Sequence, residues 1–183
     1  ACGLTRLHAS AYGGGMPSPV GHALGGLIVG LVGGRESGVG SRSVLLAATA
    51  AAVLPDVDFL WSRHSMETHS LGAAVLAGLV VLAWSRGRAP RLALVIALAW
   101  ASHVLFDWLG SDDTPPLGVM ALWPLTSEFY FAHAYVFEAI SRRTWLPNFW
   151  THNIAAVSWE LLILGPLAVL AAWWRRARGR AAH

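Results

Sequence analysis

The chain has 183 residues, of which 55% are hydrophobic and 13% are charged, and its formal net charge is +3. A soluble globular protein usually carries about 25% charged residues, so the composition excludes an ordinary soluble enzyme, intrinsic disorder, a collagen-like repeat and a coiled coil. The single cysteine, Cys2, excludes a disulfide framework and a cysteine-ligated zinc finger. All 13 basic residues are Arg and flank apolar runs, so we expect a lipid bilayer as the partner and no nucleic acid.

The first 15 residues contain neither an apolar run of signal-peptide length nor the usual basic region before one. Met16 opens a more regular segment. We therefore expect residues 1–15 to be a disordered extension or to precede the true start, and residues 16–183 to form one membrane-embedded domain.

Five apolar stretches follow, at about residues 19–34, 43–54, 68–84, 91–109 and 153–174. Crossing the hydrocarbon layer takes about 20 residues, so the fifth stretch predicts an ordinary transmembrane helix and the fourth nearly so. The first three are shorter and rich in Gly or Ala, which suits close helix packing. We predict an all-α integral membrane bundle of about five transmembrane helices. The fifth stretch, with Glu160 as its single acid, argues against the alternative of a soluble helical core.

The distribution of Arg predicts the orientation of these helices. Short cytoplasmic loops of membrane proteins carry an excess of basic residues. One side of the predicted bundle carries nine Arg, in the first loop, the third loop and the C-terminal tail: Arg35, Arg42, Arg86, Arg88, Arg91, Arg175, Arg176, Arg178 and Arg180. That side is expected to be cytoplasmic, so the N-terminus lies outside and the C-terminus inside. The opposite side has Arg63, Arg142 and Arg143, and also Arg6 if residues 1–15 belong to the protein.

Six ionisable residues near the ends of four apolar stretches are expected to lie at one level. A rise of about 1.5 Å per residue places them about 18–26 Å from the flanking Arg residues, in the outer half of the membrane. An ionised Asp in apolar surroundings is costly unless it is paired or binds a metal. The pattern therefore predicts a shared cation, with these candidate ligands: His22, Asp56, Asp58, His69, His103 and Asp107.

The local spacing of these residues supports that interpretation. His103 and Asp107 are four residues apart and project from one helical face. Asp56 and Asp58 follow Pro55, where the second helix is expected to end, so that both carboxylates turn to one point. Each motif alone has a simpler interpretation, such as a hydrogen-bonded core histidine or a turn.

Thr68 is expected to cap the third helix, which would place His69 on its first turn. The mixture of imidazole and carboxylate ligands favours a divalent transition metal over Ca or Mg. Zinc is the first choice, with Mn or Fe as alternatives, and six ligands can hold one or two ions.

An ordered set of short motifs lies within about residues 16–125. The motifs are PSPVGHALGG (17–26), LPDVDFL (54–60), HSMETHSLGA (64–73), SHVLFDWLG (102–110) and ALWPL (121–125). Taken together, the set resembles the membrane-bound, metal-dependent hydrolases described in some bacteria as LexA-regulated, the YdjM-like inner-membrane hydrolases. The resemblance implies that the six residues bind metal and that the protein is a multi-pass protein of a bacterial inner membrane.

One motif departs from the family pattern. The family usually has His-Arg-Gly before its Thr-His pair, whereas this chain has Ser65, Met66 and Glu67 after His64. The departure removes a cation and a flexible glycine beside the site, so the substrate class stays open.

The segment from Gly110 to His152 is too polar to span a membrane and unusually aromatic. Its stretch 128–140 favours an interfacial helix or lid over the recessed site, and simple packing on the outer end of the bundle is an equal alternative. His133 and His152 are expected to be surface residues. For Glu160 we expect a structural hydrogen bond to a neighbouring helix first, and a contact with a ligating histidine second.

The leading functional hypothesis is a membrane hydrolase in which metal-activated water attacks an ester or phosphoester, lipid-derived, near the outer leaflet. His64 and Glu67 flank His69 and are the candidates for proton transfer. The alternative is a non-catalytic metal-binding or metal-transport protein, and a third hypothesis is a structural bundle without metal. The oligomeric state is not predicted.

Overall fold

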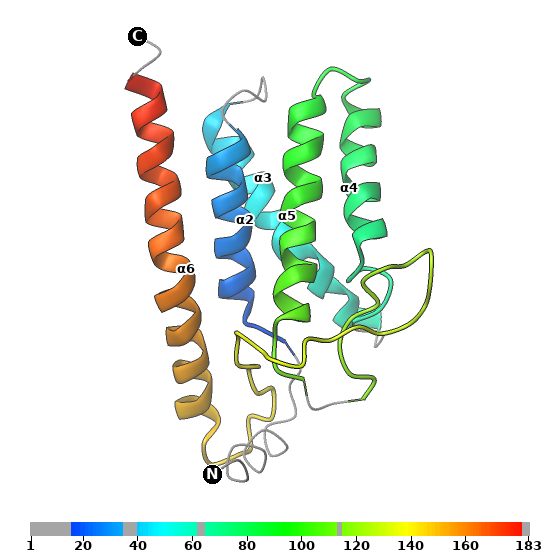
Figure 1. Ribbon diagram of the computed structural model, residues 1–183, viewed down its shortest axis with the longest axis vertical. Helices are drawn as coiled ribbons and strands as arrows, with labels where there is room; N and C mark the ends of the chain where they lie inside the picture. The colour runs from blue at the N-terminus through cyan, green and yellow to red at the C-terminus, as the bar shows by residue number, and fades with distance from the viewer. Residues whose placement is uncertain (1–15, 35–39, 62–64, 113–114, 181–183) are drawn as a thin grey trace.

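The computed structural model describes residues 16–34, 40–61, 65–112 and 115–180. Within these ranges the chain is all-helical, with isolated bridges and no strands, which confirms the predicted fold class at this level. The elements form a bundle of α-helices (Figure 1) with these bounds: α2 Pro19–Gly33, α3 Ser41–Val53, the 3-10 helix η2 Leu54–Trp61, α4 Leu71–Trp84, α5 Pro90–Trp108 and α6 Phe149–Arg180.

Two of these helices, α5 and α6, are long and apolar enough to cross a membrane. The helices α2 and α4 are apolar but have 15 and 14 residues, fewer than the roughly 20 that a perpendicular span needs. The prediction of five spans therefore stays a prediction, whereas the five helices and their approximate bounds agree with the structure.

Side-chain caps define where α2 and α4 begin. The Ser18 hydroxyl accepts a hydrogen bond from the Gly21 backbone N–H at 3.2 Å, with Pro19 at the first helical position. At the start of α4, the Ser70 hydroxyl accepts from the Ala73 N–H at 3.0 Å. The expectation that Thr68 caps this helix is therefore wrong: His69 lies before the helix, in the turn that leads into it.

Small residues bring α2 and α3 into close contact. A Cβ atom added to Gly26 would lie 2.5 Å from the Ala48 carbonyl oxygen and 2.6 Å from the Ala52 Cβ atom. Ala48 and Ala52 are fully buried and belong to a core that includes Val95 and Ala99 of α5. The helix α5 also packs against α2 and α4. Glycine at position 26 thus sets the distance between the helices that carry the site.

The long helix α6 packs along α2 at the outside of the bundle (Figure 1). Only 22% of its most apolar window is buried, and large apolar side chains such as Leu162 and Val169 are exposed. A helix that exposes so much apolar surface is suited to contact with lipid.

Two charged residues of α6 hold the two ends of α2. At the N-terminal end, the Glu160 carboxylate accepts hydrogen bonds from the Ser18 backbone N–H at 2.6 Å and from the Ser18 hydroxyl. At the C-terminal end, the Arg175 guanidinium donates to the Gly30 carbonyl at 3.1 Å and the Leu31 carbonyl at 3.3 Å. Both placements are favourable for the dipole of α2, whose N-terminus is positive and C-terminus negative. Glu160 thus makes the structural hydrogen bonds expected first for it.

The segment that connects α5 to α6 covers the end of the bundle at which α2, α4 and α6 begin (Figure 1). Its described residues contain no helix, so the interfacial helix expected at 128–140 is wrong, and the segment packs on the end of the bundle; a lid over the site stays a prediction. Backbone hydrogen bonds fix it: Val119 N–H donates to the Tyr130 carbonyl at 2.9 Å, and Leu71 N–H donates to the Ala121 carbonyl at 2.9 Å.

Candidate metal centre

The first ligand candidate, His22, lies on the first turn of α2 and is fully buried. Its Nε2 atom is 3.2 Å from Asp107 Oδ1, and its ring stacks on that of His103 with centroids 3.9 Å apart. The ring is in place because Ser18 begins α2 and is itself bound by Glu160. Neither ring nitrogen has a hydrogen-bond partner among the described residues.

His103 and Asp107 come from one face of α5, as their spacing predicts. His103 Nε2 is 2.9 Å from Asp107 Oδ2, and the other ring nitrogen, Nδ1, lies 2.8 Å from the Ala52 carbonyl oxygen. Because a carbonyl oxygen only accepts, Nδ1 carries the proton and donates it. In the neutral imidazole, Nε2 then has a lone pair directed at the site, which is the tautomer that a metal ligand needs.

The 3-10 helix η2 separates the roles of its two aspartates. It has about three residues per turn, so residues two apart point in different directions rather than to one point. Asp56 Oδ1 lies 3.6 Å from His69 Nε2 and 3.8 Å from His103 Nε2. Asp58 Oδ2 lies 3.1 Å from the opposite nitrogen of the same His69 ring, Nδ1. The two carboxylates therefore approach His69 from two sides.

His69 is held by its neighbours in the turn before α4. The Thr68 hydroxyl donates to Asp58 Oδ2 at 2.7 Å and lies 3.0 Å from His69 Nδ1, and the Trp100 indole N–H donates to the Thr68 carbonyl at 2.8 Å. These contacts bind the turn to η2 and α5. They direct His69 Nε2 toward Asp107 Oδ2, 3.5 Å away.

The charges around His69 favour a cation at this point. Burial lowers the pKa of His69, but its interactions with Asp56, Asp58 and Asp107 outweigh burial and raise the pKa to about 9. Burial raises the pKa of Asp56, but the His69 contact and the charges of His103 and His22 outweigh it, so that this pKa lies below its usual value. The carboxylates thus stabilise a positive charge between them, whether a proton or a metal ion.

The six predicted residues lie together, and five of them belong to two groups of candidate ligands that share His103. Two groups of three each place their ligand atoms within 4.8 Å of one another: His22 with Asp56 and His103, and His69 with His103 and Asp107. Asp58 belongs to neither group. Seven buried polar atoms have no hydrogen-bond partner among the described residues: His22 Nδ1 and Nε2, Asp56 Oδ1, His69 Nε2, His103 Nε2, and Asp107 Oδ1 and Oδ2.

These separations fit ligand atoms around one ion. Around a tetrahedral ion with bonds of about 2.0–2.1 Å, neighbouring ligand atoms lie about 3.3–3.4 Å apart. The measured distances of 3.6, 3.5, 3.8 and 2.9 Å join Asp56 Oδ1, His69 Nε2, His103 Nε2 and Asp107 Oδ2. Buried polar atoms without partners are costly, so a cation among these four atoms would satisfy most of them.

The predicted proton-transfer residues are placed less clearly. Glu67 is half-buried, and its backbone carbonyl accepts a hydrogen bond from the Ser70 hydroxyl at 2.6 Å. It belongs to neither ligand group. His64 and residues 1–15 lie outside the described residues.

Arg142 lies near the centre and is not among the predicted site residues. Its segment is fixed by the Ile140 N–H, which donates to the Met16 carbonyl at 3.0 Å. Burial lowers the pKa of the Arg142 guanidinium, whereas the charges of Asp56, Asp107 and Asp58 act in the opposite direction. The Arg142 guanidinium thus lies near enough to interact electrostatically with three carboxylates of the centre. No periodic pattern surrounds position 142, so sequence spacing could not have linked it to them.

Comparison with known families gives one result. The family described as YdjM inner membrane protein matches residues 16–179. Comparisons with curated proteins and with solved structures gave no match.

Proposed function

Because the chain belongs to the YdjM inner membrane protein family, we propose that it is a membrane-bound hydrolase that uses one divalent metal ion. The observation that carries this proposal is the convergence of buried imidazole and carboxylate atoms, which form two groups of three with their ligand atoms within 4.8 Å of one another. When bound, such an ion lowers the pKa of a bound water and polarises the scissile ester or phosphoester.

One ion fits the ligand set better than two. His103 belongs to both groups of three, and because its Nδ1 atom donates to the Ala52 carbonyl oxygen, only the single lone pair of Nε2 is left to bind an ion. The four atoms of Asp56, His69, His103 and Asp107 are therefore the proposed ligands. His22 faces the other oxygen of Asp107, from which it orients that carboxylate or supplies a fifth ligand. Zinc is the preferred ion because it accepts mixed nitrogen and oxygen ligands in tetrahedral sites, with Mn or Fe as alternatives.

Asp58 is proposed to orient His69 rather than to bind the ion. Its carboxylate lies 3.1 Å from His69 Nδ1 and also accepts from the Thr68 hydroxyl. A carboxylate in this place fixes the ring and increases the basicity of the opposite nitrogen.

Asp58→Asn is therefore expected to weaken metal binding by about 10–100-fold without abolishing it, the range typical of partners that orient a ligand. Titration of the purified protein against a fluorescent chelator would measure the affinity. Thr68→Val removes the neighbouring hydroxyl and should have a smaller effect in the same direction. Wild-type affinity in Asp58→Asn, or a complete loss of metal, would contradict the assignment.

Proton transfer is assigned to Glu67 and His64, which flank His69 in the sequence. A carboxylate or imidazole near the ion can accept the proton of the attacking water and return it to the leaving group. The site lies at one end of the bundle, and α6 exposes apolar side chains beside it. A lipid-derived substrate near the outer leaflet of the inner membrane is therefore the preferred substrate, with the N-terminus outside and the C-terminus cytoplasmic.

Arg142 favours an anionic phosphoester over a neutral ester. One divalent ion leaves one of the three aspartate charges uncompensated, so a site without another cation would repel a phosphate group. The Arg142 guanidinium supplies that charge and can hold a phosphate through two parallel hydrogen bonds.

Arg142→Gln is expected to lower kcat/KM for a phosphodiester by about 10-fold or more, which is the loss that follows from removing a charged hydrogen bond. The kcat/KM for a neutral carboxyl ester should stay nearly unchanged. The measurement compares both substrates in detergent. Arg143→Gln, one residue along, is the matched control and should behave as wild type. An equal loss on both substrates would contradict the assigned role.

A further inference from the structure

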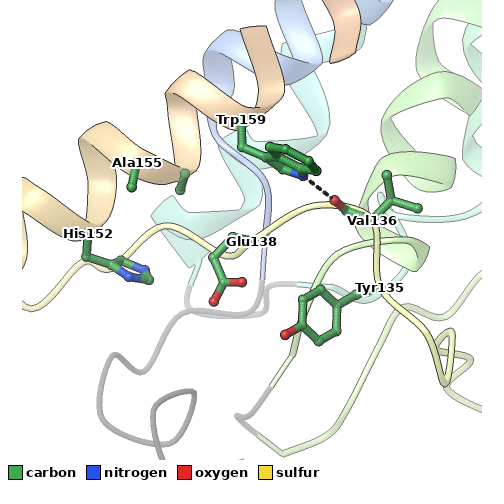
Figure 2. A pocket seen from close by; sticks show the side chains of 7 residues that line it. Tyr135, Val136, Glu138, His152, Ala155 and Trp159 are labelled. Carbon is green, nitrogen blue, oxygen red and sulfur yellow. Dashed lines mark hydrogen bonds between the residues drawn. The ribbon is translucent and has the colours of Figure 1, made fainter. Parts of the chain in front are cut away.

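A cavity of about 360 Å³ lies between α6 and the segment before it. Tyr135, Val136 and Glu138 form one wall, and His152 and Trp159 of α6 form the other (Figure 2). The cavity is separate from the metal centre, because none of its lining residues is among the six ligand candidates.

The polar hydrogens of the two α6 side chains are directed to the backbone of the opposite wall. The Trp159 indole N–H donates to the Val136 carbonyl at 2.9 Å (Figure 2). His152 Nε2 lies 2.8 Å from the Ala139 carbonyl and donates its proton to it. Both rings are thus fixed in place by a backbone acceptor.

The chemical character of the cavity is that of a site for an organic cation. Figure 2 shows the Glu138 carboxylate between the rings of His152 and Tyr135, with Trp159 along the same space. Glu138 is the only carboxylate among the described lining residues, and none of these residues is an Arg. An ammonium group is attracted by the faces of Tyr and Trp and by a carboxylate, whereas this lining offers little to a phosphate.

The position along α6 places the cavity at the edge of the lipid. The helix has 32 residues, and only about 20 of them are needed to cross the hydrocarbon layer. Counting about 20 residues back from Trp174 reaches position 154, between His152 and Trp159. Tyr135 and Trp159 are 52% and 51% exposed, so the cavity is accessible from outside the protein. Lipid headgroups occupy this depth, and Trp and Tyr are favoured there.

We propose that this cavity binds the ammonium group of a zwitterionic phospholipid, a phosphatidylethanolamine or a phosphatidylcholine, with the acyl chains along the exposed apolar face of α6. Glu138 pairs with the ammonium, and Tyr135 and Trp159 enclose it. This binding requires neither the metal ion nor hydrolysis, so it stands independently of the proposed function.

The test uses the full chain in nanodiscs made from equal parts of phosphatidylethanolamine, phosphatidylcholine and phosphatidylglycerol. Lipids that stay bound after extraction are counted by native mass spectrometry. The wild type is expected to retain the two zwitterionic lipids over phosphatidylglycerol by roughly five-fold, as one carboxylate and two aromatic rings would give. Preferential retention of phosphatidylglycerol, or no preference, would overturn the proposal.

Glu138→Gln keeps the shape of the side chain and removes its charge, so it should reduce the preference to about one. Tyr135→Leu keeps an apolar wall and should reduce it in part. Glu128→Gln removes another carboxylate of the same segment that does not line the cavity and should leave the preference unchanged. Circular dichroism and the thermal unfolding temperature establish that each variant is folded. A folded Glu138→Gln variant with the wild-type preference would overturn the proposal.

Discussion

Asp107→Asn is expected to abolish metal binding and hydrolysis while leaving the helical bundle folded. Both carboxylate oxygens are used: Oδ1 lies 3.2 Å from His22 Nε2, and Oδ2 lies 2.9 Å from His103 Nε2 and 3.5 Å from His69 Nε2. The amide of Asn has nearly the same shape but lacks the negative charge, and its NH₂ group would point toward one or two of these histidine nitrogens. The side chain is almost fully buried, so water cannot replace the lost ligand.

The first measurement is the metal content of the purified protein by elemental analysis. The metal content should fall from about one ion per chain to less than about a tenth of an ion. The neutral amide of Asn binds a divalent ion much more weakly than the carboxylate that it replaces. Loss of an ion that supplies several kcal/mol of transition-state stabilisation corresponds to a fall in rate of about 10³-fold or more. A panel of phosphodiesters and carboxyl esters would measure that rate. Glu128→Gln, an exposed carboxylate outside the site, is the control.

The outcomes separate the metal centre from the activity. Wild-type metal content in Asp107→Asn would contradict the ligand assignment. If the wild-type protein binds one ion but hydrolyses no substrate in the panel, the metal-centre assignment is supported and the hydrolase proposal is contradicted. Metal uptake into proteoliposomes by the wild type would favour the transport alternative.

Gly26→Ala is expected to be strongly destabilising, although it adds a single methyl group. The added Cβ would lie 2.5 Å from the Ala48 carbonyl oxygen and 2.9 Å from the Thr49 Cα atom, both of which are backbone atoms that cannot rotate away. The helices α2 and α3 would have to separate, at a cost of about 1–3 kcal/mol for overpacking a close contact. Since α2 carries His22 and α3 leads into Asp56, metal affinity should fall as well.

Gly165→Ala is the matched control, because nothing lies within 4 Å of a Cβ atom at that position. Glycine inside a helix costs about 1 kcal/mol relative to alanine, but a Cβ atom before Pro166 disfavours the helical conformation, so the two effects offset each other and this variant should stay close to wild type. Thermal unfolding in detergent with a chelator present compares the two variants without a contribution from metal. Equal melting temperatures for both would contradict the close packing of α2 on α3.

The convergence of six polar residues was predictable from the sequence because it depends on helix length. His22, His103 and Asp107 lie on regular helices, and a constant rise per residue places them at comparable depth. The cost of burying charge in apolar surroundings then indicates that they meet. The apolar stretches also identified the helices themselves, although α6 extends past its stretch 153–174 at both ends, to Phe149–Arg180.

The separate roles of the individual residues within the site could not be predicted from helix length. Whether Asp56 and Asp58 point together depends on whether the chain after Pro55 continues as an α-helix, a turn or the 3-10 helix that forms. The cap of α4 is Ser70 rather than Thr68, because Ser70 reaches the Ala73 N–H and both residue types favour this position. Arg142 comes from a segment without secondary-structure periodicity, and contacts between distant residues fix its place.

The spacing of the two charged residues of α6 matches the length of α2. Glu160 and Arg175 are 15 residues apart, and α2, whose ends they hold, has 15 residues. One residue inserted or deleted between them would swing one charge around the helix axis by about 100°, so α6 could then anchor only one end of its neighbour. The vertical alignment of the two helices is therefore encoded by a count of residues, and with it the height at which His22 enters the centre.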